Sequence, residues 1–190
     1  MLNNPRIRRG LMLIVVAPSG AGKTSLCRRL MADHEDLDLS ISVTTRAPRP
    51  GEEHGRDYHF ISDAQMDELI AQDALLETAA VHEFRYGTPR EPVEKALSQG
   101  KNVLFDIDWQ GAQRISVKAP SDVVRVFILP PSMSELKRRL VARAQDGMDV
   151  IERRLSRAKG EIAHWAEYDY VMLNDDFDRS YAELAHIYHA

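Results

Sequence analysis

The sequence predicts an α/β fold with a mainly parallel sheet covered by helices on both faces. Short apolar runs alternate with helical segments along most of the chain, which is the pattern of repeated β-α-β units. A glycine-rich stretch also joins the first apolar run to the first helical segment. With 190 residues, 44% of them hydrophobic, the chain can bury one substantial core. We therefore expect a single domain over residues 1–190.

The first elements follow from apolar runs and turn signals. Residues 11–16 predict a buried strand, and a helical segment follows at 25–33. Apolar and polar residues alternate over 39–44, which predicts a half-buried strand. The polar stretch 47–57 contains prolines and glycines that predict irregular structure, and 58–61 predicts another short strand.

The middle elements are marked by capping residues. A polar residue, Ser62 or Asp63, can cap a helix that runs to about Gln72. Residues 75–82 then predict an extended segment. A helix is predicted at 91–99, and the glycine that follows it is a typical stop signal.

The later elements alternate regularly. Two apolar strands, at 102–108 and 123–129, flank a predicted helix at 110–118. Two prolines stop the second strand, and Ser132 and Glu135 have capping-box spacing before the next helix. The pattern ends with helices at 136–143 and 150–167, a strand at 170–173 and a helix from about residue 177.

Short strands interrupt the alternation between residues 45 and 87, and we interpret this region as an inserted lobe. The core would then comprise 11–44 and 88–190.

The glycine-rich stretch carries the first chemical signal. It has the sequence Ala17-Pro18-Ser19-Gly20-Ala21-Gly22-Lys23-Thr24, followed by Ser25. It resembles the phosphate-gripping loop of P-loop kinases, in which backbone N–H groups converge on a polyphosphate at a helix N-terminus. Lys23 would add a mobile positive charge and Thr24 a hydroxyl for Mg²⁺. The usual motif begins with Gly where this chain has Ala17, and a merely structural turn is the alternative interpretation.

Composition limits the partners. A formal net charge of −4 and a pI near 6.0 give no general attraction to nucleic acid or to an anionic membrane. Cys27 is the only cysteine, so no internal disulfide can form, and core packing is its expected role. Because no apolar stretch reaches the roughly 18 residues of a membrane span, we expect a cytoplasmic protein. The seven histidines show no spacing typical of a transition-metal site.

A series of further motifs resembles the guanylate kinase family, whose members transfer a phosphoryl group from ATP to GMP. The resemblance extends from about Leu11 to Leu184. After the loop, its motifs appear in order as Ser42 to Gly51, Gly55 to Tyr58, Glu77, Tyr86-Gly87-Thr88, Asp106 to Gly111, Arg139, Arg143, Arg154, Tyr168 to Tyr170 and Asn174 to Asp176. It implies the three-layer P-loop kinase fold, a GMP-binding lobe at 45–87 and a short helical lid at 138–155.

The resemblance implies a GMP site in two parts. Arg46, Arg49, Tyr58 and Tyr86 would hold the phosphate, and Ser42, Glu77, Thr88 and Asp108 would face the guanine. Guanine presents N1–H and an exocyclic amino group as adjacent donors, which a carboxylate such as Glu77 can accept together. Thr88 can donate to guanine O6. Hydrogen-bond recognition of this kind discriminates strongly, because the wrong base leaves buried polar groups unpaired.

The resemblance also implies an ATP and metal site. Two acids end the strand at 102–108, at the sheet edge where ligands usually lie. We assign Asp106 to the hydrated Mg²⁺ and Asp108 to the acceptor. Lys23 and the lid residues Arg139, Arg143 and Arg154 would neutralise charge on the transferred group, and Asn174 would lie near the adenine. The lid departs from the family pattern, because Ala144 replaces a glycine and Gly147-Met148-Asp149 replaces an acidic run.

Ordinary structural roles are the alternatives for these residues. Glu77 could be a solvated charge, the GMP-site arginines a surface loop, the tyrosines packing aromatics, the two acids a structural pair, the lid arginines a solvated helix face, and Asn174 a strand cap. Two rival functions also remain. One is another small-metabolite kinase of this architecture, such as a ribose 1,5-bisphosphate kinase. The other is a guanylate-kinase-like scaffold module, which binds phosphorylated partners without catalysis. The oligomeric state is not predicted.

Overall fold

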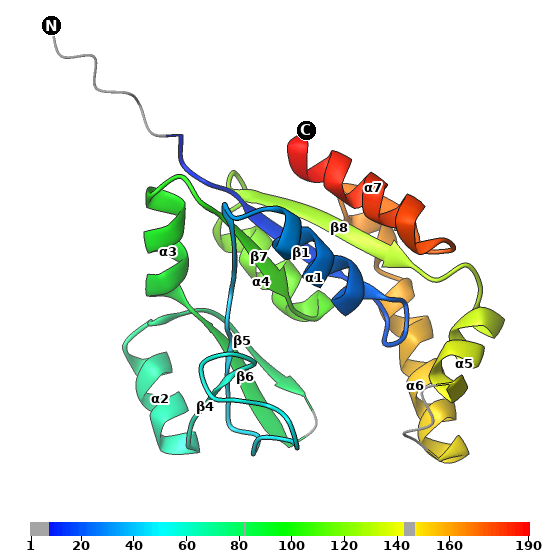
Figure 1. The fold of residues 1–190 in the computed structure, drawn as a ribbon. Helices are drawn as coiled ribbons and strands as arrows, with labels where there is room; N and C mark the ends of the chain where they lie inside the picture. The colour runs from blue at the N-terminus through cyan, green and yellow to red at the C-terminus, as the bar shows by residue number, and fades with distance from the viewer. Residues whose placement is uncertain (1–7, 82, 143–146) are drawn as a thin grey trace, which may run out of the picture. The chain divides into compact units, whose positions relative to one another are not determined.

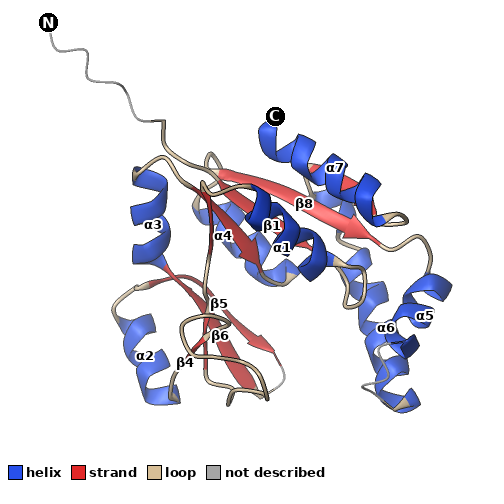
Figure 2. Ribbon diagram, viewed as in Figure 1, coloured by secondary structure: helices blue, strands red, loops and turns tan. Residues whose placement is uncertain are grey.

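The computed structural model describes residues 8–81, 83–142 and 147–190. Strands and helices follow one another through these residues, with consecutive strands at β2–β4 and β5–β6 and consecutive helices at α5–α6 (Figure 2). The larger sheet has the strand order β2-β7-β1-β8-β9, and the smaller one has the order β4-β3-β6-β5. Strand β2 pairs with β7, and β8 with β9, in parallel. The predicted α/β class with a mainly parallel sheet is confirmed.

The chain divides into two compact units. The first, the P-loop unit, comprises 13–35, 106–109 and 124–190. The second, the small-sheet unit, comprises 36–105 and 110–123 together with the N-terminal segment that ends at Met12.

The P-loop unit is built on strand β1. All five residues of β1 (Met12–Val16) are buried, as expected for a central strand that is covered on both sides. Its other elements are α1 (Lys23–Asp33), β8 (Val123–Leu129), α5 (Met133–Ala142), α6 (Met148–Ile162), the 3₁₀ helix η1 (Trp165–Glu167), β9 (Tyr170–Leu173) and α7 (Phe177–His189). Helices α1 and α7 lie side by side (Figure 1). Helices α5 and α6 share a buried cluster of Leu136, Leu140, Ile151, Leu155 and Ala158.

The small-sheet unit contains the four-stranded sheet. Its elements are β2 (Leu37–Leu39), β3 (Val43–Thr44), β4 (His59–Phe60), α2 (Asp63–Ala71), β5 (Leu75–Val81), β6 (Phe84–Pro89), α3 (Arg90–Ser98), β7 (Asn102–Asp106) and α4 (Trp109–Lys118). Helix α2 packs through Met66 onto Val43 and Leu75, and Ile61 and Leu69 extend this core. The sheet begins at Val43 and ends at Pro89, so it includes residues on both sides of the predicted lobe range.

Capping signals located several helices correctly. Ser62 caps α2 in a complete capping box, because its hydroxyl accepts from the Gln65 N–H while the Gln65 side chain accepts from the Ser62 N–H. Gly100 follows α3 with φ 81°, the left-handed conformation typical of a helix stop. The Ser132 hydroxyl accepts from the Glu135 N–H at 3.0 Å, but the Glu135 carboxylate binds Arg138 and Arg139.

The predicted strand at 39–44 is wrong in one respect. The structure has two strands, β2 and β3, separated by Ser40–Ser42. They belong to different sheets: β2 pairs with β7, while β3 pairs with β4 and β6. The alternation of apolar and polar residues continues across the connection, so it does not reveal the break.

Strand β6 was not predicted. Gly87 and Pro89 are turn signals in the sequence, yet both lie within the β5–β6 antiparallel pair. A side-chain carbon at residue 87 would lie 2.8 Å from Leu75 Cδ1. A side chain at this position would therefore force Leu75 to shift and would also lie close to the Glu77 backbone, which favours glycine here.

Two predicted ends also differ. Strand β7 ends at Asp106, so Asp108 follows the strand. The helix predicted at 150–167 ends at Ile162, and η1 follows it as a separate turn. No helix among the described residues combines the length and the apolar composition that crossing a membrane requires.

Candidate active site

The glycine-rich loop connects β1 to α1 through two left-handed residues. Gly20 has φ 95° and Gly22 has φ 100°, values that residues other than glycine rarely adopt. The Ala21 N–H closes a turn by donating to Pro18 O at 3.0 Å. In the part of the chain that the structure describes, no side chain caps α1, whose first residue is Lys23, so its first N–H groups are available to an anion.

The alanine at the start of the loop is compatible with this geometry. Asp73 is the only residue other than glycine with a positive φ in the described part of the chain. Ala17 therefore adopts a conformation that needs no glycine. The departure from the usual motif leaves the turns at Gly20 and Gly22 unchanged.

Lys23 is surrounded by carboxylates of the P-loop unit. Its ammonium group forms an ion pair with Asp106, at the end of β7. Burial lowers the pKa of Lys23, and nearby charges that include Asp108 and Glu161 oppose this effect. Burial, reinforced by Asp108, also raises the pKa of Glu161. A phosphate group would supply the negative charge that favours the ammonium form of Lys23.

The donors in this region suit a magnesium ion. Thr24 is exposed in the first turn of α1, and the Asp106 carboxylate is 37% exposed. Mg²⁺ prefers oxygen ligands, keeps several waters and is commonly held by one or two protein groups together with substrate phosphates. The hydroxyl of Thr24 and the carboxylate of Asp106 fit these requirements.

Asn174 contacts the glycine-rich loop, and Arg139 contacts Asn174. The Asn174 amide donates to Ala21 O at 2.6 Å and is buried. Arg139 donates to Asn174 O at 3.0 Å and to Glu135 at 2.8 Å. The described contact of the Asn174 side chain is therefore with the loop backbone.

Of the other two predicted lid arginines, the structure describes only one. Arg154 is half-buried on α6, within the P-loop unit. Arg143 lies outside the described residues. The predicted lid range, 138–155, includes the end of α5 and the beginning of α6.

Arg46 and Arg49 are joined by a carboxylate in the small-sheet unit. Arg46 is only 7% exposed and donates to Ala47 O at 2.7 Å and to Glu52 Oε1 at 2.9 Å. The second oxygen, Glu52 Oε2, accepts from the Arg49 N–H at 2.8 Å. Arg46 Nε is buried and has no hydrogen-bond partner among the described residues, which leaves a donor for an anionic ligand.

The two predicted tyrosines lie beside this arginine. The Tyr58 and Tyr86 rings are 5.9 Å apart, and the Arg46 guanidinium lies 5.5 Å from the Tyr58 ring centre. Burial raises the pKa of Tyr58, so its hydroxyl stays a hydrogen-bond donor at neutral pH. The predicted phosphate residues thus gather around a buried cation.

The predicted guanine residues include a buried pair. Glu77 on β5 lies opposite Thr88 on β6, and the Thr88 hydroxyl donates to Glu77 Oε1 at 2.9 Å. Their exposed fractions are 5% and 0%. The hydroxyl expected to donate to guanine O6 is thus directed at Glu77 here. Ser42 is half-buried just before β3, whereas Asp108 belongs to the P-loop unit.

Comparisons with known proteins identify the family. A sequence model described as guanylate kinase matches residues 9–190. A guanylate kinase from Caulobacter vibrioides is 62% identical over 182 residues, covering 96% of this chain and 85% of that protein. The chain belongs to the guanylate kinase family. A guanylate kinase from Rhodospirillum rubrum is 55% identical, covering 96% of this chain and 84% of that protein.

A solved structure agrees with this assignment. The crystal structure of guanylate kinase from Anaplasma phagocytophilum has a TM-score of 0.78 and 34% identity, covering 96% of this chain and 86% of that one. The SH3-kinase fragment of tight junction protein 3 has a TM-score of 0.50 and 14% identity, and this chain covers 60% of it. The second likeness concerns the fold alone.

Two acids of this guanylate kinase family member were not singled out in the sequence. Glu52 binds both predicted phosphate arginines. The carboxylate of Glu161 interacts electrostatically with Lys23 and Asp108. Glu52 follows Arg49 by three residues across a Pro-Gly turn, a spacing that brings its side chain back to the Arg49 N–H. Glu161 has no comparable local signal.

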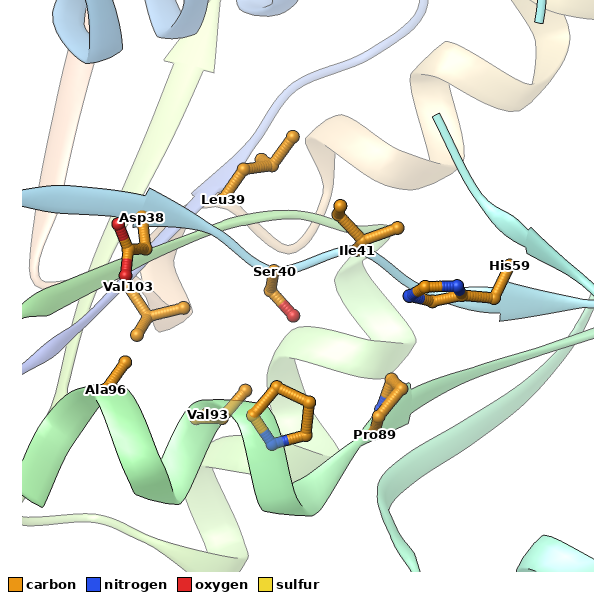
Figure 3. Close-up of a pocket in the computed structure, with 10 residues that line it drawn as sticks. Asp38, Leu39, Ser40, Ile41, His59, Pro89, Val93, Ala96 and Val103 are labelled. Carbon is orange, nitrogen blue, oxygen red and sulfur yellow. The ribbon is translucent and has the colours of Figure 1, made fainter. Parts of the chain in front are cut away.

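A separate cavity of about 360 Å³ lies in the small-sheet unit (Figure 3). It is bounded by the Ser40–Ile41 connection, Pro89 and helix α3, with His59 at one end. Burial lowers the pKa of His59, which favours a neutral imidazole. None of the predicted site residues that the structure describes lines this cavity.

Proposed function

We propose that this chain transfers the γ-phosphoryl group of ATP to the phosphate of GMP, giving ADP and GDP. The observation that carries the choice of acceptor is the buried Glu77–Thr88 pair. A buried carboxylate can accept the N1–H and amino protons of guanine. Adenine instead offers an unprotonated N1 that repels it, which gives a large preference.

The small-sheet unit supplies most of the proposed GMP site. Arg46 and Arg49 bind the phosphate, with hydroxyls from Tyr58 and Tyr86. The buried, uncommitted Nε of Arg46 supports this role, because burial strengthens a charge-assisted hydrogen bond. Ser42, Glu77 and Thr88 face the base, and the resemblance to the family also assigns Asp108 to the acceptor.

The P-loop unit supplies the proposed ATP site. Residues 17–25 bind the phosphates, and Lys23 neutralises their charge. Thr24 and Asp106 are the side chains that would hold Mg²⁺, which supplies Lewis-acid stabilisation of phosphate charge when bound. Asp106 pairs with Lys23 in this structure, so bound phosphate would compete with this carboxylate for the ammonium group.

The proposed mechanism needs no strong general base. The attacking oxygen of GMP already carries negative charge near neutral pH, so catalysis depends on alignment and charge neutralisation. Lys23, Arg139, Arg143 and Arg154 provide positive charge at the transferred group. Arg46 and Arg49 hold the phosphate of GMP, whose oxygen is the acceptor.

An acceptor panel tests this function. The purified chain is incubated with ATP, Mg²⁺ and one acceptor: GMP, AMP, CMP, UMP or ribose 1,5-bisphosphate. We expect ADP and GDP in equal amounts with GMP and at least about 10²-fold lower kcat/KM with the others. Preferred use of another acceptor would contradict the guanine assignment. No ADP from any acceptor would instead indicate a binding module.

A further inference from the structure

We infer that Asn174 is a positioning residue that holds the phosphate-binding loop in shape, independently of the base attached to the triphosphate. This inference rests on the proposed ATP-binding role of the loop. It differs from a position near the adenine, which the sequence suggested for Asn174, because a positioning residue acts on the loop backbone rather than on the ligand.

The contacts of Asn174 tie the loop to the end of β9. Its side-chain Nδ2 donates to Ala21 O at 2.6 Å, and its own N–H donates to Leu129 O at 2.8 Å. The residue is only 5% exposed. A buried amide bonded at both side chain and main chain has little freedom, so Ala21 is held relative to the sheet.

The two glycines of the loop leave room for this support. A side-chain carbon at residue 22 would overlap Asn174 Nδ2. A carbon at residue 20 would lie 3.0 Å from Leu140 and 3.1 Å from Leu136, both on α5. The loop is therefore packed at Gly22 by Asn174 and at Gly20 by two buried leucines. Its shape depends on neighbours as well as on glycine's conformational freedom.

Helix α5 also supports Asn174 directly. Arg139 Nη2 donates to Asn174 O at 3.0 Å, while Arg139 Nε is held by Glu135 at 2.8 Å. The same helix thus contacts the loop through leucines and Asn174 through an arginine. Removing the Asn174 amide would free the Ala21 carbonyl while leaving these other contacts in place.

A ligand without a base separates loop positioning from adenine recognition. We would titrate ATP and inorganic tripolyphosphate, each with Mg²⁺, into the wild-type chain and the Asn174→Ala variant by calorimetry. Loss of one buried hydrogen bond to the loop should raise both Kd values by a similar factor of about tenfold. The Kd for GMP should stay within about twofold of wild type.

Two further variants control for packing. Asn174→Leu retains a branched side chain of similar size without a donor, so it should weaken both ligands as Asn174→Ala does, even if the alanine variant folds poorly. Asn102→Ala removes an asparagine that accepts the Leu11 N–H at 3.0 Å in the small-sheet unit. It should lower thermal stability and leave both Kd values within about twofold.

Several outcomes would overturn the inference. If Asn174→Ala weakened the binding of ATP but not that of tripolyphosphate, Asn174 would be assigned to the adenine. Unchanged binding of both ligands would exclude a role for Asn174 in the loop. If the wild-type chain bound ATP but not tripolyphosphate, phosphate binding by the loop would depend on the base, which would contradict the inference. Expected results here, combined with no phosphorylation of GMP in the acceptor panel, would support the loop inference and reject only the proposed function.

Discussion

At the scale of single residues, carboxylates hold the cations that are proposed to bind phosphate. Lys23 pairs with Asp106, Arg46 with Glu52 and Arg139 with Glu135. A partly buried cation is costly without a partner, so these carboxylates stabilise the site before a nucleotide binds. They also determine where each cation lies.

Glu52→Gln should weaken GMP binding selectively. The carboxylate bridges Arg46 and the Arg49 backbone, and an amide can accept only one of these donors well. We expect KM for GMP to rise about tenfold, corresponding to a charged hydrogen bond of about 1.5 kcal/mol, with KM for ATP unchanged. Steady-state kinetics with each substrate varied in turn would measure this.

Glu53→Gln is the matched control. Glu53 is exposed and pairs with Arg56 at the surface, so its removal should leave both KM values near wild type. Equal effects of the two substitutions would contradict a specific role for Glu52.

Glu77→Gln should also separate the two substrates. Replacing an acceptor oxygen by an amide removes the paired acceptance of guanine N1–H and amino protons. We expect kcat/KM for GMP to fall about 10²-fold or more, while the Kd for ATP stays within about twofold. Equal losses for GMP and ATP would show that Glu77 has no specific role toward guanine.

At the scale of secondary structure, capping and packing together stabilise individual helices. Helix α2 combines a complete capping box with a buried Met66. Ser62→Ala should lower the free energy of unfolding by about 1 kcal/mol, measured by urea denaturation. Gln65→Ala and the double variant complete a cycle. Because both residues form one box, the two losses should not add, and full additivity would contradict the reciprocal cap.

The sequence predicts strands and helices well where the local signal agrees with the final pairing. Strand β9 occupies the predicted range 170–173. The break after Leu39 was missed because β2 pairs with the distant strand β7. Strand β6 was missed because it contains Gly87 and Pro89, although its partner β5 is the neighbouring strand in the chain. Gly87, for example, is a turn signal in the sequence but a close-approach residue in the sheet.

For the candidate site, too, some residues could be predicted from the sequence and some contacts could not. The resemblance to the family supplied Arg46, Arg49, Glu77 and Thr88 by their order along the chain. The bridging contacts of Glu52 were not predicted, since they depend on how a turn folds back. The Asn174–Ala21 bond joins residues 153 positions apart, and no local pattern reports it.

At the scale of the whole molecule, ion pairs make stability depend on pH. Arg46 holds the pKa of Glu52 low, and Arg125 does the same for Asp169. Arg138, and then Arg139, lowers the pKa of Glu135 to about 2. Their folded pKa values lie below the unfolded ones. The stability they add is therefore present above about pH 4.5 and is lost as the pH falls through the folded values.

Urea denaturation at pH 7, 5 and 3 would test this dependence. We expect little change in the free energy of unfolding between pH 7 and 5, and a measurable decrease between pH 5 and 3. Glu52→Gln should lose less over the second interval, because one of the depressed carboxylates is gone. Constant stability from pH 5 to pH 3 would contradict the prediction.

We propose that residues of the P-loop unit activate ATP, while residues of the small-sheet unit bind most of GMP. The Lys23→Met variant separates these two roles when turnover and GMP binding are measured on the same preparation. Loss of the ammonium group should reduce production of ADP and GDP by about 10²-fold or more, while the calorimetric Kd for GMP stays within about twofold of wild type. Unchanged turnover in the Lys23→Met variant would contradict the account.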